Sequence, residues 1–222
     1  TNLQTSYPME NRKTNTSMFQ LKTNSRLIRT AVQAFMASVF LASCTPAQQK
    51  QEQAEVAERT PAETFTTVEA AYTVDTLFSR QLNEVYVAYL TLKDALVDSD
   101  PEASRMAAAG MGKALAMVNP DLLKGAALND WNTFFPEIGR SLRSISTGST
   151  LEEQRLGLST LSEGLWKAIS AFGTAKSEVY RDYCPMALKN KGAYWLTSAP
   201  EIRNPYFGES MLECGYAREK MK

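Results

Sequence analysis

The chain has 222 residues, of which 24 are basic and 24 acidic, and it contains no histidine. A formal net charge of zero gives no electrostatic reason to expect a nucleic-acid partner. The absence of histidine removes the commonest general base near neutral pH and the commonest metal ligand. The sequence also has no Ser-centred elbow, no Cys–His pair and no pair of carboxylates at a recognisable motif, so we expect a protein that is not an enzyme. Any metal site must be built from other side chains.

The first 43 residues are typical of a targeting sequence. The apolar run AVQAFMASVFLAS (31–43) follows three basic residues, Lys22, Arg26 and Arg29. A basic stretch, a short apolar run and small residues in this order describe a secretory signal. The run is shorter than the roughly 20 apolar residues of a membrane-spanning helix. We predict an upstream or non-native leader at 1–17 and a signal peptide at 18–43.

Cys44 closes the tetrapeptide LASC, which resembles the lipobox of bacterial lipoproteins. In that class the cysteine is acylated, so the resemblance implies a membrane anchor at Cys44. The alternative is a plain secretory signal with a chance cysteine. The next residues are rich in Gln, Glu, Ala and Pro and cannot bury enough surface to fold. We predict a disordered tether at 44–70 and a location in the bacterial envelope, facing an oxidising compartment.

Four amphipathic periodicities between residues 71 and 175 predict an antiparallel four-helix bundle. The first places five apolar residues on one helix face: Leu82, Val85, Tyr89, Leu92 and Leu96. The second begins where Asp100 can cap a helix and Pro101 fits its first turn. Its predicted inward face is small: Ala103, Met106, Gly110, Ala114 and Met117. We assign Met106, Met111 and Met117 to the core, because methionine fills gaps in apolar cores.

The third periodicity ends near Gly148 and contains Pro136, which we expect to kink or split the helix. Its apolar residues are Leu128, Trp131, Phe135, Ile138, Leu142 and Ile145. The fourth begins at STLE, where Ser149 and Glu152 have the spacing of a capping box. Its apolar residues are Leu158, Leu161, Leu165, Ile169 and Phe172.

The composition changes at about residue 176, where Pro, Gly, Tyr and Asn become frequent. VYRDY, AYWLT and MLECGYA predict short strands, and NPYFG predicts a turn. We therefore expect a mainly α protein with a small C-terminal lobe of short strands and loops, 176–222, packed on the bundle. Five large side chains either line a ligand pocket or form the interior of this lobe: Tyr183, Trp195, Arg203, Tyr206 and Phe207. Arg203 either binds an anion or pairs with Glu201 at the surface.

The segments VYRDYCPMA, GAYWLTS, EIRNPYFG and MLECG resemble the closing signature of the bacterial domain of unknown function three-three-four-seven. YLTLKDALVDSD (89–100) and QRLGLSTLSEGL (154–165) are similar to its helical portion. Where we expect an aromatic after QR, Leu156 and Leu158 stand, a change that we assign to the core. Members of that family occur as lipoproteins and as domains appended to periplasmic adaptors of heavy-metal efflux pumps. The resemblance implies the handling of copper, silver or a similar ion, with an efflux adaptor as partner.

Four sulfur-containing residues of the lobe form two closely spaced pairs, Cys184 with Met186 and Met211 with Cys214. Thiolate and thioether sulfurs favour Cu(I), whereas structural zinc sites use four cysteine or histidine ligands. The alternative is a Cys184–Cys214 disulfide, which would contribute about 3–4 kcal/mol in the chain-entropy model and leave both methionines in the lobe core. A reduced pair could bind metal and an oxidised pair could not, so the alternatives are not exclusive.

Two hypotheses for the whole protein follow. The first is an envelope lipoprotein that binds a soft metal ion as a resistance or efflux accessory. The second is a disulfide-stapled interaction module without metal, which docks onto an envelope partner such as an efflux adaptor.

Overall fold

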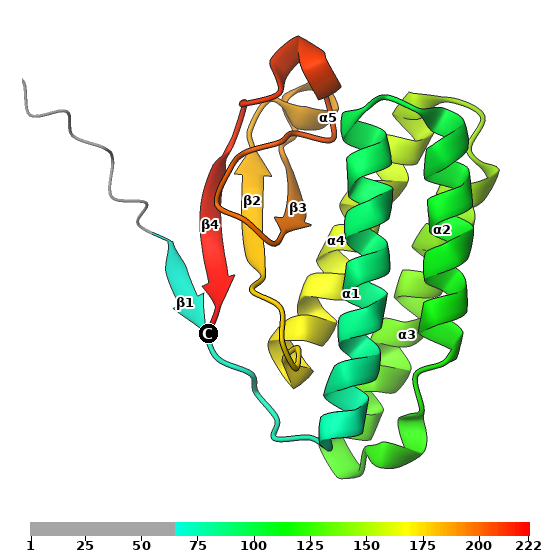
Figure 1. Ribbon diagram of the computed structural model, residues 1–222, viewed down its shortest axis with the longest axis vertical. Coiled ribbons are helices and arrows are strands. Elements are labelled where there is room, and N and C mark those ends of the chain that lie inside the picture. Colours follow the sequence, from blue (N-terminus) through cyan, green and yellow to red (C-terminus); the bar gives the residue numbers. More distant parts are fainter. Residues whose placement is uncertain (1–64) are drawn as a thin grey trace, which may run out of the picture. The chain divides into compact units, whose positions relative to one another are not determined.

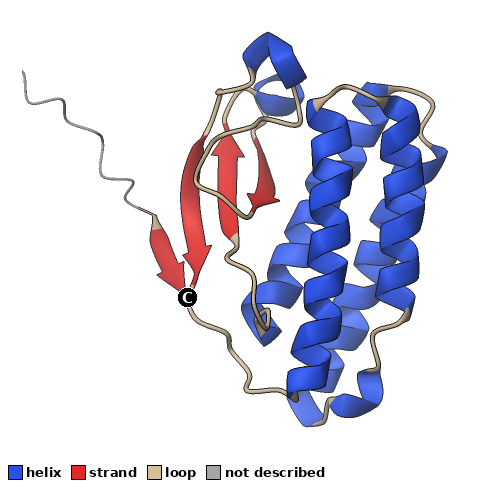
Figure 2. Ribbon diagram, in the orientation of Figure 1, coloured by secondary structure: helices blue, strands red, loops and turns tan. Residues whose placement is uncertain are grey.

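The computed structural model describes residues 65–222, which form a bundle of four long helices with a small sheet beside it (Figures 1 and 2). Consecutive helices run in opposite directions through short connections, as in an antiparallel bundle (Figure 1). The mainly α fold with a lobe of short strands is therefore confirmed. The bundle consists of α1 (Thr76–Val97), α2 (Pro101–Ala116), α3 (Gly125–Thr147) and α4 (Leu151–Phe172).

Helices α1 and α4 bury the apolar rows that the sequence predicts. All five predicted residues of α1 are fully buried, and those of α4 are at most 2% exposed. The capping box of α4 is formed one position later than predicted: Thr150 Oγ1 accepts from the Glu153 amide at 3.2 Å, and the Glu153 carboxylate accepts from the Thr150 amide at 3.3 Å. Leu156 is 58% exposed, so its assignment to the core is wrong. It lies two residues before Leu158 and so points to the opposite side of the helix.

Helix α2 begins as predicted, but its inward face is different. The Asp100 carboxylate caps the helix by accepting from two backbone amides, and Pro101 stands in the first turn. Met106 and Met117 are 62% and 74% exposed, so only Met111 of the three methionines belongs to the core. The buried row is Ser104, Ala108, Met111 and Leu115. Alanine and glycine occur on every side of this helix, so its hydrophobic period does not distinguish its faces.

Helix α3 continues without a break through Pro136. Pro136 and Asn132, whose carbonyl loses a hydrogen-bond donor there, are both exposed, so water can satisfy that carbonyl. Phe135 is 41% exposed and lies outside the core, contrary to the prediction. Of the other predicted core positions of α3, Trp131, Ile138, Leu142 and Ile145 are buried. Leu128 is partly buried against the core.

Two glycines of α4 allow α3 and α4 to approach closely. A Cβ atom on Gly157 would lie 2.6 Å from Cγ1 of Ile145, and one on Gly164 would lie 3.3 Å from Cγ1 of Ile138. Each glycine therefore accommodates a buried isoleucine of the neighbouring helix.

The strand order of the sheet is β1-β4-β2-β3. Strand β2 (Tyr180–Cys184) pairs antiparallel with β3 (Ala193–Thr197) and with β4 (Tyr216–Met221), and β1 (Thr66–Val68) runs parallel to β4. VYRDY and AYWLT are thus confirmed as the sources of strands. In MLECGYA only the last two residues enter a strand, while Met211 ends the short helix η2 (Gly208–Met211).

Strand β1 lies within 44–70, the range predicted as a tether, so the structure corrects that boundary. The lobe takes one strand from the chain before the bundle and three from the chain after it (Figure 1). The predicted leader, signal peptide, Cys44 and most of the tether fall outside the described residues.

The lobe packs on the bundle through β3, which contacts α4 and α1. Tyr89 of α1 accepts a hydrogen bond from the Leu196 amide at 3.0 Å, and its hydroxyl lies 2.8 Å from Ser162 Oγ of α4. Arg155 of α4 donates to the Pro205 carbonyl at 2.8 Å.

Within residues 65–222, none of the helices combines the length and the apolar character needed to cross a membrane.

Candidate functional site

The two cysteines of the lobe meet at one end of the sheet. Tyr183 pairs with Tyr216 across β2 and β4, so the residues just beyond this pair, on both strands, are neighbours. Cys184 ends β2, and Cys214 lies on the loop that leads into β4. Their Sγ atoms are 3.0 Å apart. We call these two residues the thiol pair.

Asn204 holds the loop that carries Cys214. It is fully buried, and its side-chain amide donates to the Cys214 carbonyl at 2.6 Å. Its backbone amide donates to the Leu212 carbonyl at 2.8 Å, and its side-chain oxygen accepts from the Tyr206 amide at 2.8 Å. Asn204 thus ties the beginning of the segment 204–214 to its end.

Gly215 allows the backbone at Cys214 to press against the sheet. Its φ is +145°, and a Cβ atom there would lie 2.6 Å from Cη2 of Trp195 and 3.1 Å from the Tyr183 carbonyl. A side chain at this position would therefore displace the loop from β2 and β3. The ECG segment brings Cys214 to Cys184 because the glycine follows the cysteine directly.

The two thiols differ in environment. Cys184 is fully buried in the hydrophobic core, whereas Cys214 is partly exposed. The hydrogen bond with Cys184, together with burial, raises the pKa of the Cys214 thiol to about 11.

The two methionines flank the thiol pair in different ways. Met186 follows Cys184 by two residues and is 46% exposed. Met211 is partly buried, and its carbonyl accepts from the Cys214 amide at 3.2 Å. The structure therefore brings the thiols together and leaves Met186 toward solvent at the edge of the site.

The turn after Met186 has a strained backbone. Leu188, Lys189 and Asn190 of α5 (Ala187–Asn190) all have φ between 52° and 64°. Consecutive left-handed residues other than glycine are uncommon, and such conformations cost of order 1 kcal/mol or more each. A Cβ atom on Gly192 would collide with the Tyr183 ring, so this ring closes the turn.

The remaining predicted site residues have mixed placements. Trp195 and Tyr206 are buried and their rings meet edge to face at 6.1 Å, which places them in the interior of the lobe. Phe207 is partly buried against the core. Tyr183 packs against Tyr194 with ring centroids 4.6 Å apart. Arg203 is exposed.

Sequence reasoning missed three residues around the thiol pair: Asn204, Gly215 and Asp182. The turn signal NPYFG contained Asn204, but its buried role depends on a loop that closes in three dimensions. Asp182 is fully buried on β2. A charged residue between alternating aromatic residues was the signal that could have marked it. Asp182 also acts on Tyr86 of the bundle. Burial is the largest cause that raises the pKa of Tyr86, and the nearby charges of Tyr89 and Asp182 raise this pKa further.

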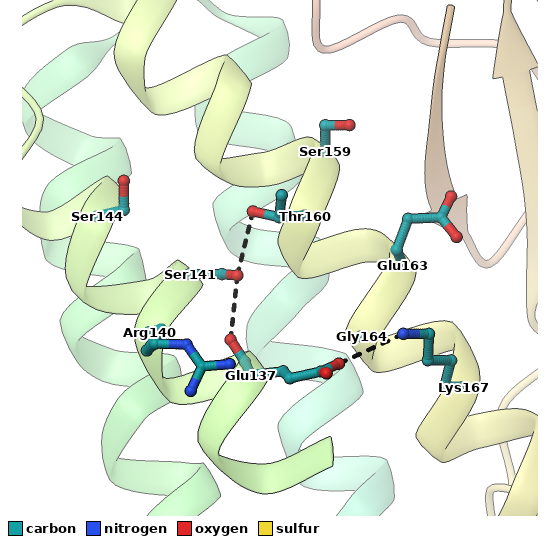
Figure 3. Close-up of a pocket in the computed structure, with 9 residues that line it drawn as sticks. All are labelled: Glu137, Arg140, Ser141, Ser144, Ser159, Thr160, Glu163, Gly164 and Lys167. Atoms are coloured by element: carbon teal, nitrogen blue, oxygen red, sulfur yellow. Dashed lines mark hydrogen bonds and ion pairs between the residues drawn. The ribbon is translucent and has the colours of Figure 1, made fainter. Parts of the chain in front are cut away.

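A pocket of about 480 Å³ lies between α3 and α4 and is lined by polar and charged side chains (Figure 3). Ser141 donates to Thr160 Oγ1 at 3.1 Å, and Lys167 pairs with Glu137 at 3.3 Å. Its charged groups are thus partly neutralised within the pocket. Among residues 65–222, no group of three or more histidine, cysteine, aspartate or glutamate side chains converges as a metal site would require.

The fold defines a class of protein: a four-helix bundle that carries a small mixed sheet with a thiol pair at its end. Residues 85–177 match the model of a family described as "Protein of unknown function (DUF3347)". Residues 85–177 are thus similar to this family, which confirms the resemblance seen in the sequence over a shorter range. The match spans the bundle from the middle of α1 onward and stops before both cysteines of the lobe. No curated protein and no solved structure matches the chain.

Proposed function

We propose that this protein is a lipid-anchored protein of the bacterial envelope that binds a soft metal ion, Cu(I) or Ag(I), as an accessory of heavy-metal resistance or efflux. The thiol pair supplies two ligands, and Met186 and Met211 supply thioethers. The observation that supports this proposal is the 3.0 Å separation of the two Sγ atoms, which come from segments 30 residues apart.

The donor set suits a soft ion. Thiolates and thioethers prefer Cu(I), and the site offers no oxygen or imidazole ligand cluster of the kind that zinc or calcium takes. Two sulfurs that share one ion lie roughly 4 Å apart, since each bond is about 2.3 Å long. The thiols must therefore separate by about 1 Å, and we assign this shift to the partly exposed side chain of Cys214, because Asn204 holds its backbone.

To complete the site, the methionine side chains turn toward the thiol pair. The Met186 side chain is half exposed and has room to turn toward Cys184. Exposed side chains exchange rotamers rapidly, so this turn needs no rearrangement of the fold.

Titration of the reduced full chain with Cu(I), in competition with a Cu(I) chelator, tests this function. We expect one ion per chain in the parent, none in Cys184→Ser, and weaker binding in Met186→Leu and Met211→Leu. These leucine variants keep volume and apolarity, so their stability should change little. Met106→Leu is the matched control, because this methionine is exposed on α2. A reduced parent that binds no Cu(I) would refute the function, and leucine variants that bind like the parent would refute the thioether ligands.

The same distance also favours a second function. Sulfurs 3.0 Å apart need only a small motion to form a bond, and the envelope is oxidising. In that case the protein is a disulfide-stapled interaction module that docks onto an envelope partner such as an efflux adaptor. Quantitative thiol counting on chain purified from the envelope distinguishes the two, since a fully oxidised pair that resists mild reductants supports the module.

The anchor is tested separately. Replacing Cys44 with alanine should release the protein from the membrane fraction or block its processing. A Cys44→Ala chain that stays in the membrane and is cleaved at the same place would show that the segment LASC is not a lipidation site.

A further inference from the structure

The two sulfurs of the thiol pair are not equivalent toward external reactants. Cys184 lies in β2 with no exposed surface and belongs to the hydrophobic core. Cys214 lies on a loop and is partly exposed. An external thiol or disulfide can therefore reach Cys214 before it can reach Cys184, because exchange requires direct access to the sulfur.

We propose that the thiol pair performs thiol–disulfide exchange in a fixed order, with Cys214 as the sulfur that reacts with external thiols and disulfides and Cys184 as the resolving thiol. We further infer that closing this disulfide shuts the metal site. The second statement rests on the proposed function, whereas the first does not.

The oxidising direction has two steps. The Cys214 thiolate attacks one sulfur of an external disulfide RS–SR, whose bond breaks, and one RS⁻ leaves as a mixed disulfide forms on Cys214. The Cys184 thiolate then attacks the Cys214 sulfur and expels the second RS⁻. In sum, the two cysteines lose two electrons and two protons, and the external disulfide becomes two thiols.

The geometry suits the second step. Cys184 Sγ already lies 3.0 Å from Cys214 Sγ, so resolution needs no rearrangement of the lobe. Asn204 holds the Cys214 backbone through its 2.6 Å hydrogen bond, and Gly215 allows the loop to lie against Trp195. A mixed disulfide on Cys214 is therefore held beside its resolving thiol.

The reducing direction follows the same order. An external thiolate attacks Cys214, the bond to Cys184 breaks, and Cys184 leaves as the buried thiolate and takes up a proton. A second external thiolate then attacks the outer sulfur of the mixed disulfide, which releases the Cys214 thiolate and forms the external disulfide RS–SR. Attack on Cys184 is blocked, because that sulfur has no surface through which a thiolate can approach.

Exposure of the reduced full chain to oxidised glutathione, followed by acid quenching and mass spectrometry, tests the order. All chains carry Cys44→Ala, so that only the thiol pair reacts. We expect the parent to form the internal disulfide without a lasting adduct and Cys184→Ser to accumulate a glutathione adduct on Cys214. In Cys214→Ser the adduct on Cys184 should form at least roughly tenfold more slowly than the adduct on Cys214 forms in Cys184→Ser, because Cys184 is buried. Equal rates for the two single variants, or a lasting adduct in the parent, would overturn the proposal.

A second measurement does not depend on the folding of the serine variants. Brief alkylation of the reduced Cys44→Ala chain with a substoichiometric reagent should label Cys214 ahead of Cys184 in peptide maps. Equal labelling would overturn the order.

Cu(I) competition on the reduced and the oxidised Cys44→Ala chain tests whether the disulfide prevents metal binding, and it separates this statement from the proposed function. Binding by the reduced chain and none by the oxidised chain supports it. Equal binding by both chains overturns it. If the reduced chain binds no Cu(I), the proposed function and the redox control of metal binding both fail, while the exchange order is judged by the glutathione and alkylation results alone.

Discussion

Single residues decide where the backbone can approach another part of the molecule. Gly215 and Gly110 show the two extremes. At Gly215 a Cβ atom would lie 2.6 Å from Trp195, in a backbone conformation with φ of +145°. At Gly110, inside α2, a Cβ atom would meet nothing within 4 Å. The first glycine is required by the site, and nothing in the structure explains the second.

Replacing Gly215 with alanine should destabilise the lobe by roughly 1–3 kcal/mol, as forced overpacking and an unsuitable φ do. Gly110→Ala is the control and should stabilise the protein by about 0.5–1 kcal/mol, because glycine inside a helix is less favourable than alanine. Urea unfolding followed by circular dichroism measures both. A Gly215→Ala protein as stable as the parent would mean that the loop at Cys214 does not press on Trp195.

Buried tyrosines predict a loss of stability at alkaline pH. Burial, as the largest cause, raises the pKa of Tyr86, Tyr89 and Tyr206 above the ordinary value of about 10. A group with a raised folded pKa contributes stability that is complete below its unfolded pKa and is lost as the pH rises toward the folded pKa. The free energy of unfolding should therefore fall above about pH 10, by up to roughly 1.4 kcal/mol per pH unit for each tyrosine.

Tyr86→Phe tests this expectation, because it removes one ionisable group and only a 3.3 Å hydrogen bond to the Glu178 carbonyl. Its unfolding free energy should fall less steeply with pH than that of the parent. Tyr216→Phe, at an exposed position, is the control and should follow the parent. Parallel curves for Tyr86→Phe and the parent would contradict the argument.

At the scale of single elements, burial follows the hydrophobic period wherever one face is clearly more apolar than the others. Rows of large apolar residues identify the inward faces of α1 and α4. Helix α2 has no such row, because its own alanine and glycine residues occur on every side of it. Leu161 and Leu156 show the distinction within one helix: Leu161 is fully buried and Leu156 is 58% exposed.

Leu161→Ala should cost roughly 2–5 kcal/mol of unfolding free energy, since it leaves a cavity in the core. Leu156→Ala is the matched control and should change stability by less than about 0.5 kcal/mol. Both values come from denaturant unfolding curves. A small effect of Leu161→Ala would place that side chain outside the core.

At the scale of the whole molecule, the lobe and the bundle are joined by polar contacts as well as by packing. The Arg155 guanidinium bonds the Pro205 carbonyl at 2.8 Å, the Leu96 carbonyl at 3.3 Å and Ser99 Oγ at 2.9 Å. It thereby links α4, the end of α1 and the loop that begins at Asn204. This loop carries Cys214 at its far end, so the bundle helps to position the thiol pair.

Arg155→Lys should loosen this junction, because an ammonium group cannot reproduce the fork of donors. We expect a cost of about 1.5–3 kcal/mol, the range for hydrogen bonds to charged groups, and faster amide exchange in the segment 204–214. Arg140→Lys is the control, at an exposed position on α3. Unchanged amide exchange in the Arg155→Lys variant would show that the lobe docks on the bundle without the hydrogen bonds of Arg155.

The sequence by itself determined the helical class, the inward faces of α1 and α4, the Asp100 cap and the segments of β2 and β3. These features are local, because each depends on residues a few positions apart along the chain. It also singled out Cys184 and Cys214 as a pair, but only as one of several arrangements of sulfur.

Tertiary structure alone decided the features that depend on distant segments. Strand β1 precedes the bundle in the sequence and pairs in a sheet whose other three strands follow the bundle. No local sequence pattern predicts this pairing. The register of β2 with β4 sets Cys184 against Cys214, and Asn204, Gly215 and Arg155 take their roles only from that closure. Strand pairing and loop docking are long-range contacts, whose partners are selected by the whole packed molecule rather than by the spacing of neighbouring residues.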